Sequence, residues 1–313
     1  MNIKVVFLML GLATAPFAFG EGITQDELNR QLRESAAEND VAVVRALLEK
    51  GADVNSSTES GKTALMRAVE NGNRATAVVL LSKGANVNAR TTSGSTALTF
   101  AAENGYQDLS AMLVELGANV HDRTRSGWDA LMIAARLGYD VVVDQLMLFQ
   151  ADPGASDKQG NTAIHGAVEQ GHSKVVKVLL KYKPNLNIPN RKGETPLIKA
   201  AIGGFGNIVQ LLLANGANAN AQDRSGATAL LLAAEKGQGD VVNVLLQAKA
   251  DVDLADQGGN TPLMMAAGGC QAKIVSLLLT KGAQVTKKNN DGKTAKDIAE
   301  QQHHTECLTL LGG

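Results

Sequence analysis

Aromatic residues are scarce in this chain: Phe, Trp and Tyr make up 3% of its 313 residues, and there is a single tryptophan. Because hydrophobic residues still account for 44%, small and branched aliphatic side chains must fill any core. A charge excess of one sign is also absent, since 30 Lys and Arg and 31 Asp and Glu leave a formal charge of −1. Such a balance gives no reason to expect binding to nucleic acid or to an anionic membrane.

Recognised catalytic and metal motifs are missing as well. The chain contains no Gly-x-Ser-x-Gly elbow, phosphate-binding loop, HExxH or paired-cysteine zinc spacing. His303 and His304, with Glu306, come nearest to a metal site, but adjacent side chains on a helix point about 100° apart. We therefore expect no catalytic residues, no metal and no cofactor, in a protein that is not an enzyme.

A continuous hydrophobic run occurs only at the N-terminus. Residues 1–20 combine Lys4, an apolar stretch from Val5 to Ala13 and small residues before Glu21, a pattern typical of a secretory signal peptide. An uncleaved anchor is the alternative, although the run is shorter than the ~20 residues that a membrane span needs. We expect cleavage near Glu21, export to a bacterial periplasm, with secretion beyond it as the alternative, and no membrane attachment afterwards.

Glycine, in contrast, is frequent and regularly spaced. One series recurs every 33 residues without a slip, at Gly61, Gly94, Gly127, Gly160, Gly193, Gly226, Gly259 and Gly292. Within one unit, Thr63 to Asn71 predicts a short helix that ends at Gly72, and Ala75 to Lys83 predicts another that ends at Gly84. Helices of about nine residues do not persist alone in water. Their apolar side chains can be buried only against the next unit, which predicts a stacked solenoid.

The repeated phrase resembles the ankyrin repeat. It reads Gly-x-Thr-Pro/Ala-Leu, then two alanine-like positions, glycine, a Val- and Leu-rich helix and Gly-Ala-Asx-Val-Asn, from about residue 30 to 313. The resemblance implies an all-α repeat solenoid of stacked 33-residue helix-turn-helix units with β-hairpin-like loops. After the signal peptide at 1–20, we expect an N-terminal capping repeat at 21–60, seven repeats at 61–291 and a C-terminal capping repeat at 292–313.

Two cysteines, Cys270 and Cys307, are too few for a disulfide-held scaffold. They fall in neighbouring repeats at non-equivalent positions. Stacked helices lie about 8–10 Å apart, whereas a disulfide needs Cα atoms within about 7 Å. We expect two free thiols, with a disulfide in an oxidising compartment as the alternative.

Three loops depart from the repeat. Gln150, Lys183 and Lys249 stand where other units carry the glycine that ends the second helix, and prolines 153, 184 and 189 lie nearby. A left-handed residue other than glycine costs about 1 kcal/mol. We expect altered loops there, either strained or shaped for a partner.

The hairpin tip is a repeated position where the resemblance places a partner-binding surface. Two residues before each repeat glycine, four consecutive units are basic, with Arg125, Lys158, Arg191 and Arg224. A stripe of cations ~8–10 Å apart suits an acidic partner surface. The alternative is that basic side chains simply suit a solvated turn.

A second repeated position lies on the first helices, where the resemblance predicts solvent exposure on the concave face. It carries Phe100, Ile133, Leu232 and Met265, and Trp128 stands in the loop beside it. Aromatic and Met side chains are favoured in interface cores. We predict that these residues bind a partner; shared packing between first helices is the alternative.

Together these features predict a monomeric, non-enzymatic protein–protein interaction scaffold whose partner is a protein. Two other roles fit the same pattern: a secreted effector that binds a host protein, and an inhibitor or immunity-type partner of an exported toxin or enzyme. An enzyme would need a clustered, non-repeating set of polar residues, and the sequence has none. A structural spacer would show no apolar or basic bias on the concave face.

Overall fold

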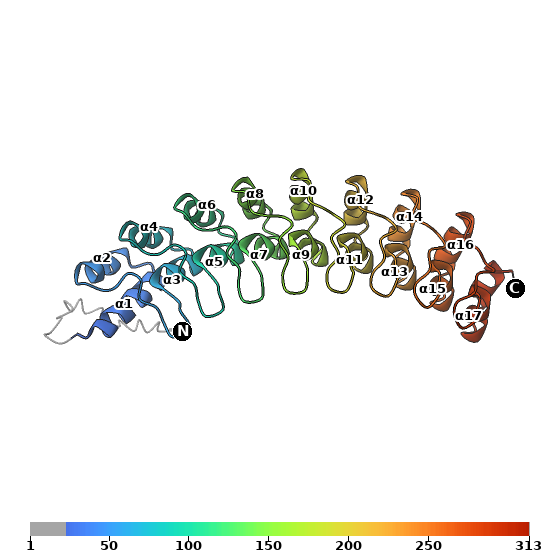
Figure 1. Ribbon diagram of the computed structural model, residues 1–313, viewed down its shortest axis with the longest axis horizontal. Helices are drawn as coiled ribbons and strands as arrows, with labels where there is room; N and C mark the ends of the chain where they lie inside the picture. The colour runs from blue at the N-terminus through green and yellow to red at the C-terminus, as the bar shows by residue number, and fades with distance from the viewer. Residues whose placement is uncertain (1–22, 313) are drawn as a thin grey trace, which may run out of the picture.

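The computed structural model describes residues 23–312, so the predicted signal peptide at 1–20 lies outside the described residues. Helix pairs stack in chain order into a long arch, with the first and last described residues at opposite ends of the array (Figure 1). Odd-numbered helices form the inner row and even-numbered helices the outer row, and a loop extends from the inner row between successive pairs. The predicted all-α repeat solenoid is confirmed.

We call the helix pairs units 1 to 9; unit 1 is residues 21–60, units 2 to 8 each begin at a repeat glycine from Gly61 onward, and unit 9 is residues 292–313. The helices of the described residues are α1 (Gln25–Ala37), α2 (Val41–Glu49), α3 (Ala64–Glu70), α4 (Arg74–Ser82), α5 (Ala97–Glu103), α6 (Gln107–Glu115), α7 (Ala130–Leu137), α8 (Asp140–Leu148), α9 (Ala163–Glu169), α10 (Ser173–Lys181), α11 (Pro196–Ile202), α12 (Gly206–Ala214), α13 (Ala229–Glu235), α14 (Gly239–Gln247), α15 (Pro262–Gly268), α16 (Ala272–Thr280), α17 (Ala295–Gln301) and α18 (Thr305–Leu310).

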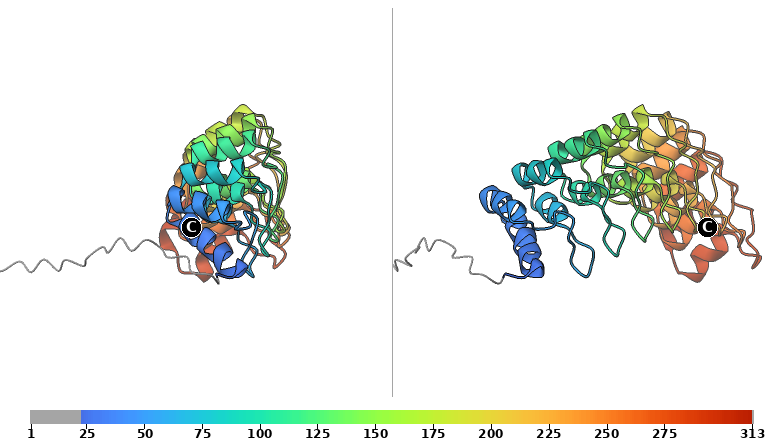
Figure 2. Two further views of the ribbon diagram at one scale, coloured as in Figure 1. Left: turned by 90° about the vertical axis from the view of Figure 1, so that its left-hand side faces the viewer. Right: turned by 60° about the vertical axis from the view of Figure 1, so that its left-hand side comes forward.

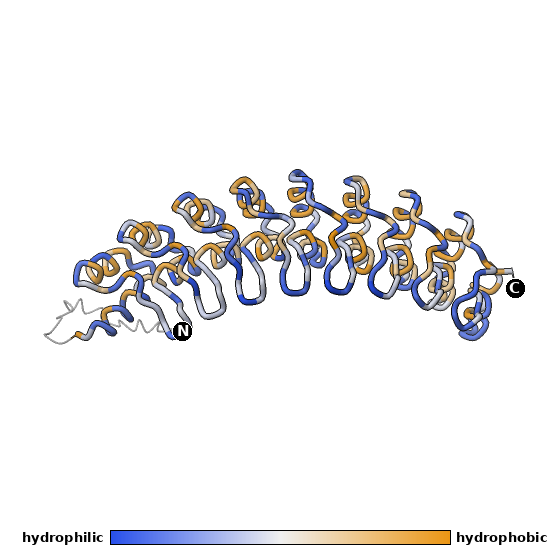
Figure 3. Tube along the Cα trace, in the orientation of Figure 1, coloured by the Kyte–Doolittle hydropathy of each residue, from blue (hydrophilic) through white to orange (hydrophobic). Residues whose placement is uncertain are grey.

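The core is continuous because each helix packs on the same helix of the neighbouring units. Helix α7 contacts α5 and α9 in the inner row, and α8 contacts α6 and α10 in the outer row. Leu131 of α7 and Leu146 of α8 are both 1% exposed as a result. Hydrophobic residues concentrate on the helices and hydrophilic residues on the loops (Figure 3). Burial therefore depends on stacking, as expected for helices this short.

Hydrogen bonds between successive hairpins hold the inner loops in register. The backbone N–H of Arg125 donates to Ser93 O at 2.7 Å, and that of Arg191 donates to Gln159 O at 2.7 Å. Equivalent bonds link Thr92 to Ser60, Lys158 to Ser126, Arg224 to Lys192, Gln257 to Ser225 and Asn290 to Gly258. Within residues 23–312 the β-type pairing consists of three isolated bridges, which supports the description of these loops as β-hairpin-like.

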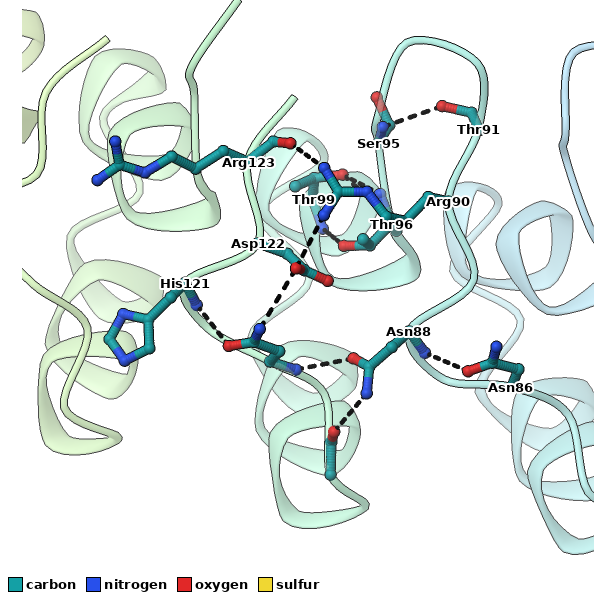
Figure 4. Close-up of polar contacts among 12 residues, drawn as sticks. Asn86, Asn88, Arg90, Thr91, Ser95, Thr96, Thr99, His121, Asp122 and Arg123 are labelled. Atoms are coloured by element: carbon teal, nitrogen blue, oxygen red, sulfur yellow. Dashed lines mark hydrogen bonds and ion pairs between the residues drawn. The ribbon is translucent and has the colours of Figure 1, made fainter. Parts of the chain in front are cut away.

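An asparagine after the second helix makes another link between units in four of them, as Figure 4 shows for Asn88. Asn88 Nδ2 donates to Gly117 O at 2.9 Å, and Asn88 Oδ1 accepts from the N–H of Asn119 at 2.8 Å. His121 and Gly154 occupy the next two equivalent positions. Within the described residues the His121 side chain makes no such bond, and Gly154 has no side chain to make it. The boundaries on both sides of unit 4 thus lack this asparagine link.

The loops that lack glycine keep the ordinary backbone, so the expected altered shape is wrong at Gln150. Gln150 N–H bonds to Met147 O and Ala151 N–H to Leu146 O, both at 3.0 Å, as Gly84 and Ala85 bond in unit 2. The strain is nevertheless present, since φ is +64° at Gln150, +50° at Lys183 and +61° at Lys249. At Lys183 the following proline, Pro184, also removes one N–H donor.

We expect Gln150→Gly to stabilise the protein by about 0.5–1 kcal/mol, because glycine adopts the left-handed region without steric cost. Urea unfolding followed by circular dichroism measures the change. Gly117→Ala is the reciprocal control: Gly117 has φ +92° and free space around an added Cβ, so this change should destabilise by backbone strain alone. Equal stability of Gln150→Gly and the parent chain would contradict the claim that backbone strain at Gln150 lowers the stability.

Candidate partner-binding surface

A groove of 840 Å³ opens on the inner side of the array beside α7. Three successive hairpins contribute hydroxyl and amide side chains, among them Ser95, Ser126 and Gln159. Its apolar part consists of Trp128, Ile133 and Leu137, of which Leu137 is 44% exposed. Figure 2 shows the same loops projecting together from the inner row in two further views. The groove therefore combines aromatic and aliphatic side chains with polar ones, as protein interfaces do.

A chain of charged contacts fixes the tryptophan at the edge of this groove. The guanidinium of Arg136 lies over the Trp128 ring, with its Cζ 5.1 Å from the ring centroid. Arg136 also pairs with Glu169 at 3.6 Å, and Glu169 pairs with Lys199 at 3.0 Å. One face of the ring is therefore covered by a cation, and the ring is oriented before any partner arrives.

Gly166 makes room for that arrangement. It occupies the same position in α9 that Ile133 occupies in α7. A Cβ at Gly166 would lie 3.3 Å from Cβ of Arg136, which is tighter than ordinary contact. Because unit 5 has no side chain at this point, Arg136 can cross toward Trp128 and Glu169.

The start of α7 is also distinctive. Asp129 stands where the other repeats carry threonine, and its Oδ1 accepts from the N–H of Met132 at 2.8 Å. Burial raises the pKa of the Asp129 carboxyl above its ordinary range, although this hydrogen bond acts in the opposite direction. The carboxylate thus serves as a helix cap directly beneath the Trp128 loop.

The basic hairpin tips form a row of free cations. Arg125, Lys158, Arg191 and Arg224 are all exposed, and their backbones follow one another through the hairpin bonds. None of the four side chains forms an ion pair or hydrogen bond within residues 23–312. Arg125 lines the groove, and the other three continue the row over units 4 to 6. This row is available to acidic groups of a partner.

The structure brings some of the predicted apolar residues together and separates the others. Trp128 and Ile133 share the groove with Arg125. Phe100 does not line it, and Lys62 Nζ covers the Phe100 ring at 4.9 Å from the centroid. The predicted exposure on the first helices is wrong, because the whole position is half-buried between neighbouring first helices; it comprises Arg67, Phe100, Ile133, Gly166, Lys199, Leu232 and Met265.

Leu232 and Met265 lie on α13 and α15, three and four units beyond α7, and do not line the groove. Shared packing therefore accounts for much of the apolar character at this position. Whether the predicted residues bind a partner stays a prediction.

Sequence reasoning missed Arg136 and Leu137, although both carried a signal. At the position of Arg136, four other units have glutamate: Glu70, Glu103, Glu169 and Glu235. A single charge reversal at a repeated position marks a contact peculiar to one unit. Leu137 similarly places an apolar side chain at the exposed end of a first helix, where neighbouring units have Asn104 and Gln170.

The histidines of unit 5 have structural partners. His172 Nε2 bonds to Arg136 O at 3.0 Å, and His165 bonds to Thr162 and to Glu194 O. In the part of the chain that the structure describes, no three His, Cys, Asp or Glu residues are grouped to hold a metal ion. No helix between residues 23 and 312 is both long and apolar enough to span a bilayer.

A family model for ankyrin repeats in three copies matches the chain in overlapping stretches, at residues 32–124, 89–156, 116–190, 183–256 and 230–312. No curated protein matches the sequence. The matched stretches extend from unit 1 to unit 9 and agree with the helix pairs, the hairpins and the 33-residue period. The chain belongs to the ankyrin repeat family, whose arrays are generally protein–protein interaction modules.

Proposed function

We propose that this protein is a non-enzymatic scaffold that binds a protein partner in the groove beside α7. The observation that carries the proposal is the coincidence of a pre-oriented Trp128, the exposed Leu137 and the free Arg125 in one 840 Å³ groove. Buried aromatic and arginine anchors contribute most of the energy in protein interfaces. A surface with these residues in one recess suits a partner segment that inserts an apolar side chain.

The partner segment that fits best carries acidic groups beside its apolar side chain. Arg125 begins a row of unpaired cations that continues through Lys158, Arg191 and Arg224. Complementary charges raise association rates and select against basic partners. The segment would therefore place its apolar residue on Trp128 and its carboxylates along the hairpin tips.

We further propose export to the periplasm, on the strength of the signal-peptide pattern at residues 1–20. In that compartment the scaffold would restrain or protect another exported protein, such as a toxin or enzyme. Recovery of the protein from the culture medium instead would favour an effector that acts on another cell.

Capture from the native host tests the groove. The full chain with an affinity tag should retain a partner that Leu137→Asp and Arg125→Glu each lose by about tenfold or more, because each removes a central contact. Leu148→Asp is the matched control: Leu148 is 69% exposed on α8, in the outer row of the same unit. This change adds the same charge away from the groove and should leave capture unchanged.

The single tryptophan supplies an independent readout. A partner seated on Trp128 should shift its fluorescence, and the titration should lose that shift in Leu137→Asp. Equal capture by all three variants, with no change in Trp128 emission, would place the interface elsewhere and contradict the proposal.

A further inference from the structure

The turn between the two helices of a unit faces the next unit. In units 2 to 7 this turn contains a left-handed glycine, and a Cβ added there would meet the side chain that precedes the second helix of the following unit. A Cβ added at Gly138 would lie 2.9 Å from the His172 ring, and one added at Gly237 would lie 2.8 Å from the side-chain amide of Gln271. Any side chain at this position is therefore directed at the second helix of its neighbour.

Unit 8 has such a side chain. Cys270 replaces the glycine, keeps the left-handed backbone at φ +53° and is exposed. L-residues rarely adopt this conformation, and here it places a Cβ where units 2 to 7 have none. The equivalent neighbour is His304, whose Nδ1 bonds to Ala267 O at 3.1 Å and joins unit 9 to unit 8.

Cys307 lies one helical turn beyond His304 on α18 and is 0% exposed. It occupies the core position that Ile274 occupies in α16. At the equivalent positions of units 1 and 2, Thr76 Oγ1 donates to Asn39 Oδ1 at 2.8 Å, so a side chain at the position of Cys270 reaches the side chain at the position of Cys307. Both thiols are free in the structure, as expected from the sequence, but the turn of one unit opposes the second helix of the next and so directs one thiol toward the other.

We propose that Cys270 and Cys307 form a disulfide that fastens the C-terminal unit to unit 8. The reaction is thiol–disulfide exchange with a small-molecule disulfide such as oxidised glutathione. The exposed Cys270 thiolate attacks one sulfur of the oxidant, forms a mixed disulfide and releases one glutathione thiolate. The Cys307 thiolate then attacks the Cys270 sulfur and expels the second glutathione thiolate. Two thiols become one disulfide, the oxidant becomes two thiols, and these take up the two protons.

The order of reaction follows from exposure. Burial and the contact with Cys270 raise the pKa of the Cys307 thiol to about 11, which keeps it protonated and protected until Cys270 has reacted.

The consequence of the bond is local. Within residues 23–312, α17 and α18 pack against a neighbouring unit on one side only, and units with one neighbour open first in repeat proteins.

Peptide mapping without reduction tests the bond. The reduced, folded full chain is treated with oxidised glutathione and digested. We expect a peptide that links Cys270 to Cys307, with a glutathione adduct only as an intermediate. In Cys307→Ala the adduct on Cys270 should persist, because no second thiol resolves it. In Cys270→Ser, which alters an exposed residue and so keeps the fold, Cys307 should stay unmodified.

Hydrogen exchange measures the effect on the array. After oxidation, amides of α17 and α18 should exchange about tenfold more slowly, while those of α1 and α2 at the other end stay unchanged. A stable glutathione adduct in the parent chain at the level seen in Cys307→Ala would overturn the bond. A link that leaves exchange in α17 and α18 unchanged would overturn its fastening role.

Discussion

Replacing Leu131 by alanine is expected to destabilise the protein by about 3 kcal/mol. Leu131 is 1% exposed in α7, where neighbouring inner helices pack on both sides. Removing a buried leucine loses its transfer free energy and leaves a cavity, which together cost about 2–5 kcal/mol. The flanking helices cannot move in to fill the cavity, because each of them is held in place by its own neighbours.

The site of the change should matter as well as its size. In a linear array each unit contacts only its neighbours, so a weak central unit divides the array into two parts. We expect one urea transition for the parent chain and a broader or divided transition for Leu131→Ala. Circular dichroism reports both parts, while the fluorescence of Trp128 reports only the region of unit 4.

Leu148→Ala is the control for this change. It removes the same atoms from the same unit, but Leu148 is 69% exposed, so its effect should stay within about 0.5 kcal/mol. If both variants lost the same stability, burial by stacking would not be the source of the effect.

Acid is expected to destabilise the protein by about 2–3 kcal/mol through His165 alone between pH 7 and pH 4.5. His165 is 0% exposed, and burial lowers its pKa from 6.5 to about 4. Its Nδ1 accepts from the N–H of Thr162 at 3.1 Å, so Nε2 carries the proton and donates to Glu194 O at 3.2 Å. The neutral ring thus links unit 5 to unit 6 through its hydrogen bond to Glu194 O.

The sign follows from proton uptake on unfolding. Below pH 6.5 the histidine is protonated in the unfolded state, whereas in the folded state it becomes protonated only near pH 4. The stabilisation is therefore complete above the unfolded pKa and is lost as pH falls through that interval.

His165→Thr isolates this contribution. Unit 3 already has Thr99 at the equivalent position, where Thr99 Oγ1 accepts from the N–H of Thr96 at 2.8 Å. The variant should be less stable at pH 7, because it loses the bond to Glu194, but its stability should depend less on pH. Parallel pH profiles from urea unfolding for the two proteins would refute a buried neutral His165.

Much of the fold can be predicted from local sequence. A glycine recurs every 33 residues, and a threonine, or Asp129 in unit 4, precedes each first helix. The helices are too short to be stable alone, so stacking is the only way to bury Leu131 and its equivalents. Loop residues such as Asp157 behave as local chemistry predicts, since Asp157 Oδ1 accepts from the N–H of Gln159 at 2.8 Å. Each of these interactions joins residues only a few positions apart, so they can be predicted from the sequence alone.

The candidate site is only partly predictable. Arg125, Trp128 and Ile133 belong to repeated positions that the ankyrin resemblance marks as surface, and they share a groove. Phe100, Leu232 and Met265 occupy a repeated position as well, but neighbouring helices half-bury it. A repeat pattern shows that positions are equivalent; it does not show how much of each position the next unit covers.

The sequence by itself determined the repeat, its period, the helix boundaries and the need to stack, because these depend on backbone conformation and hydrophobic burial within one unit. Only the tertiary structure decided which side chains meet across unit boundaries. The cation over Trp128 depends on the missing side chain at Gly166, and the direction of Cys270 toward Cys307 depends on a turn that faces the next helix. Cys270 and Cys307 are 37 positions apart, and Gly166 is 30 positions from Arg136, so stacking of the units brings these residues together.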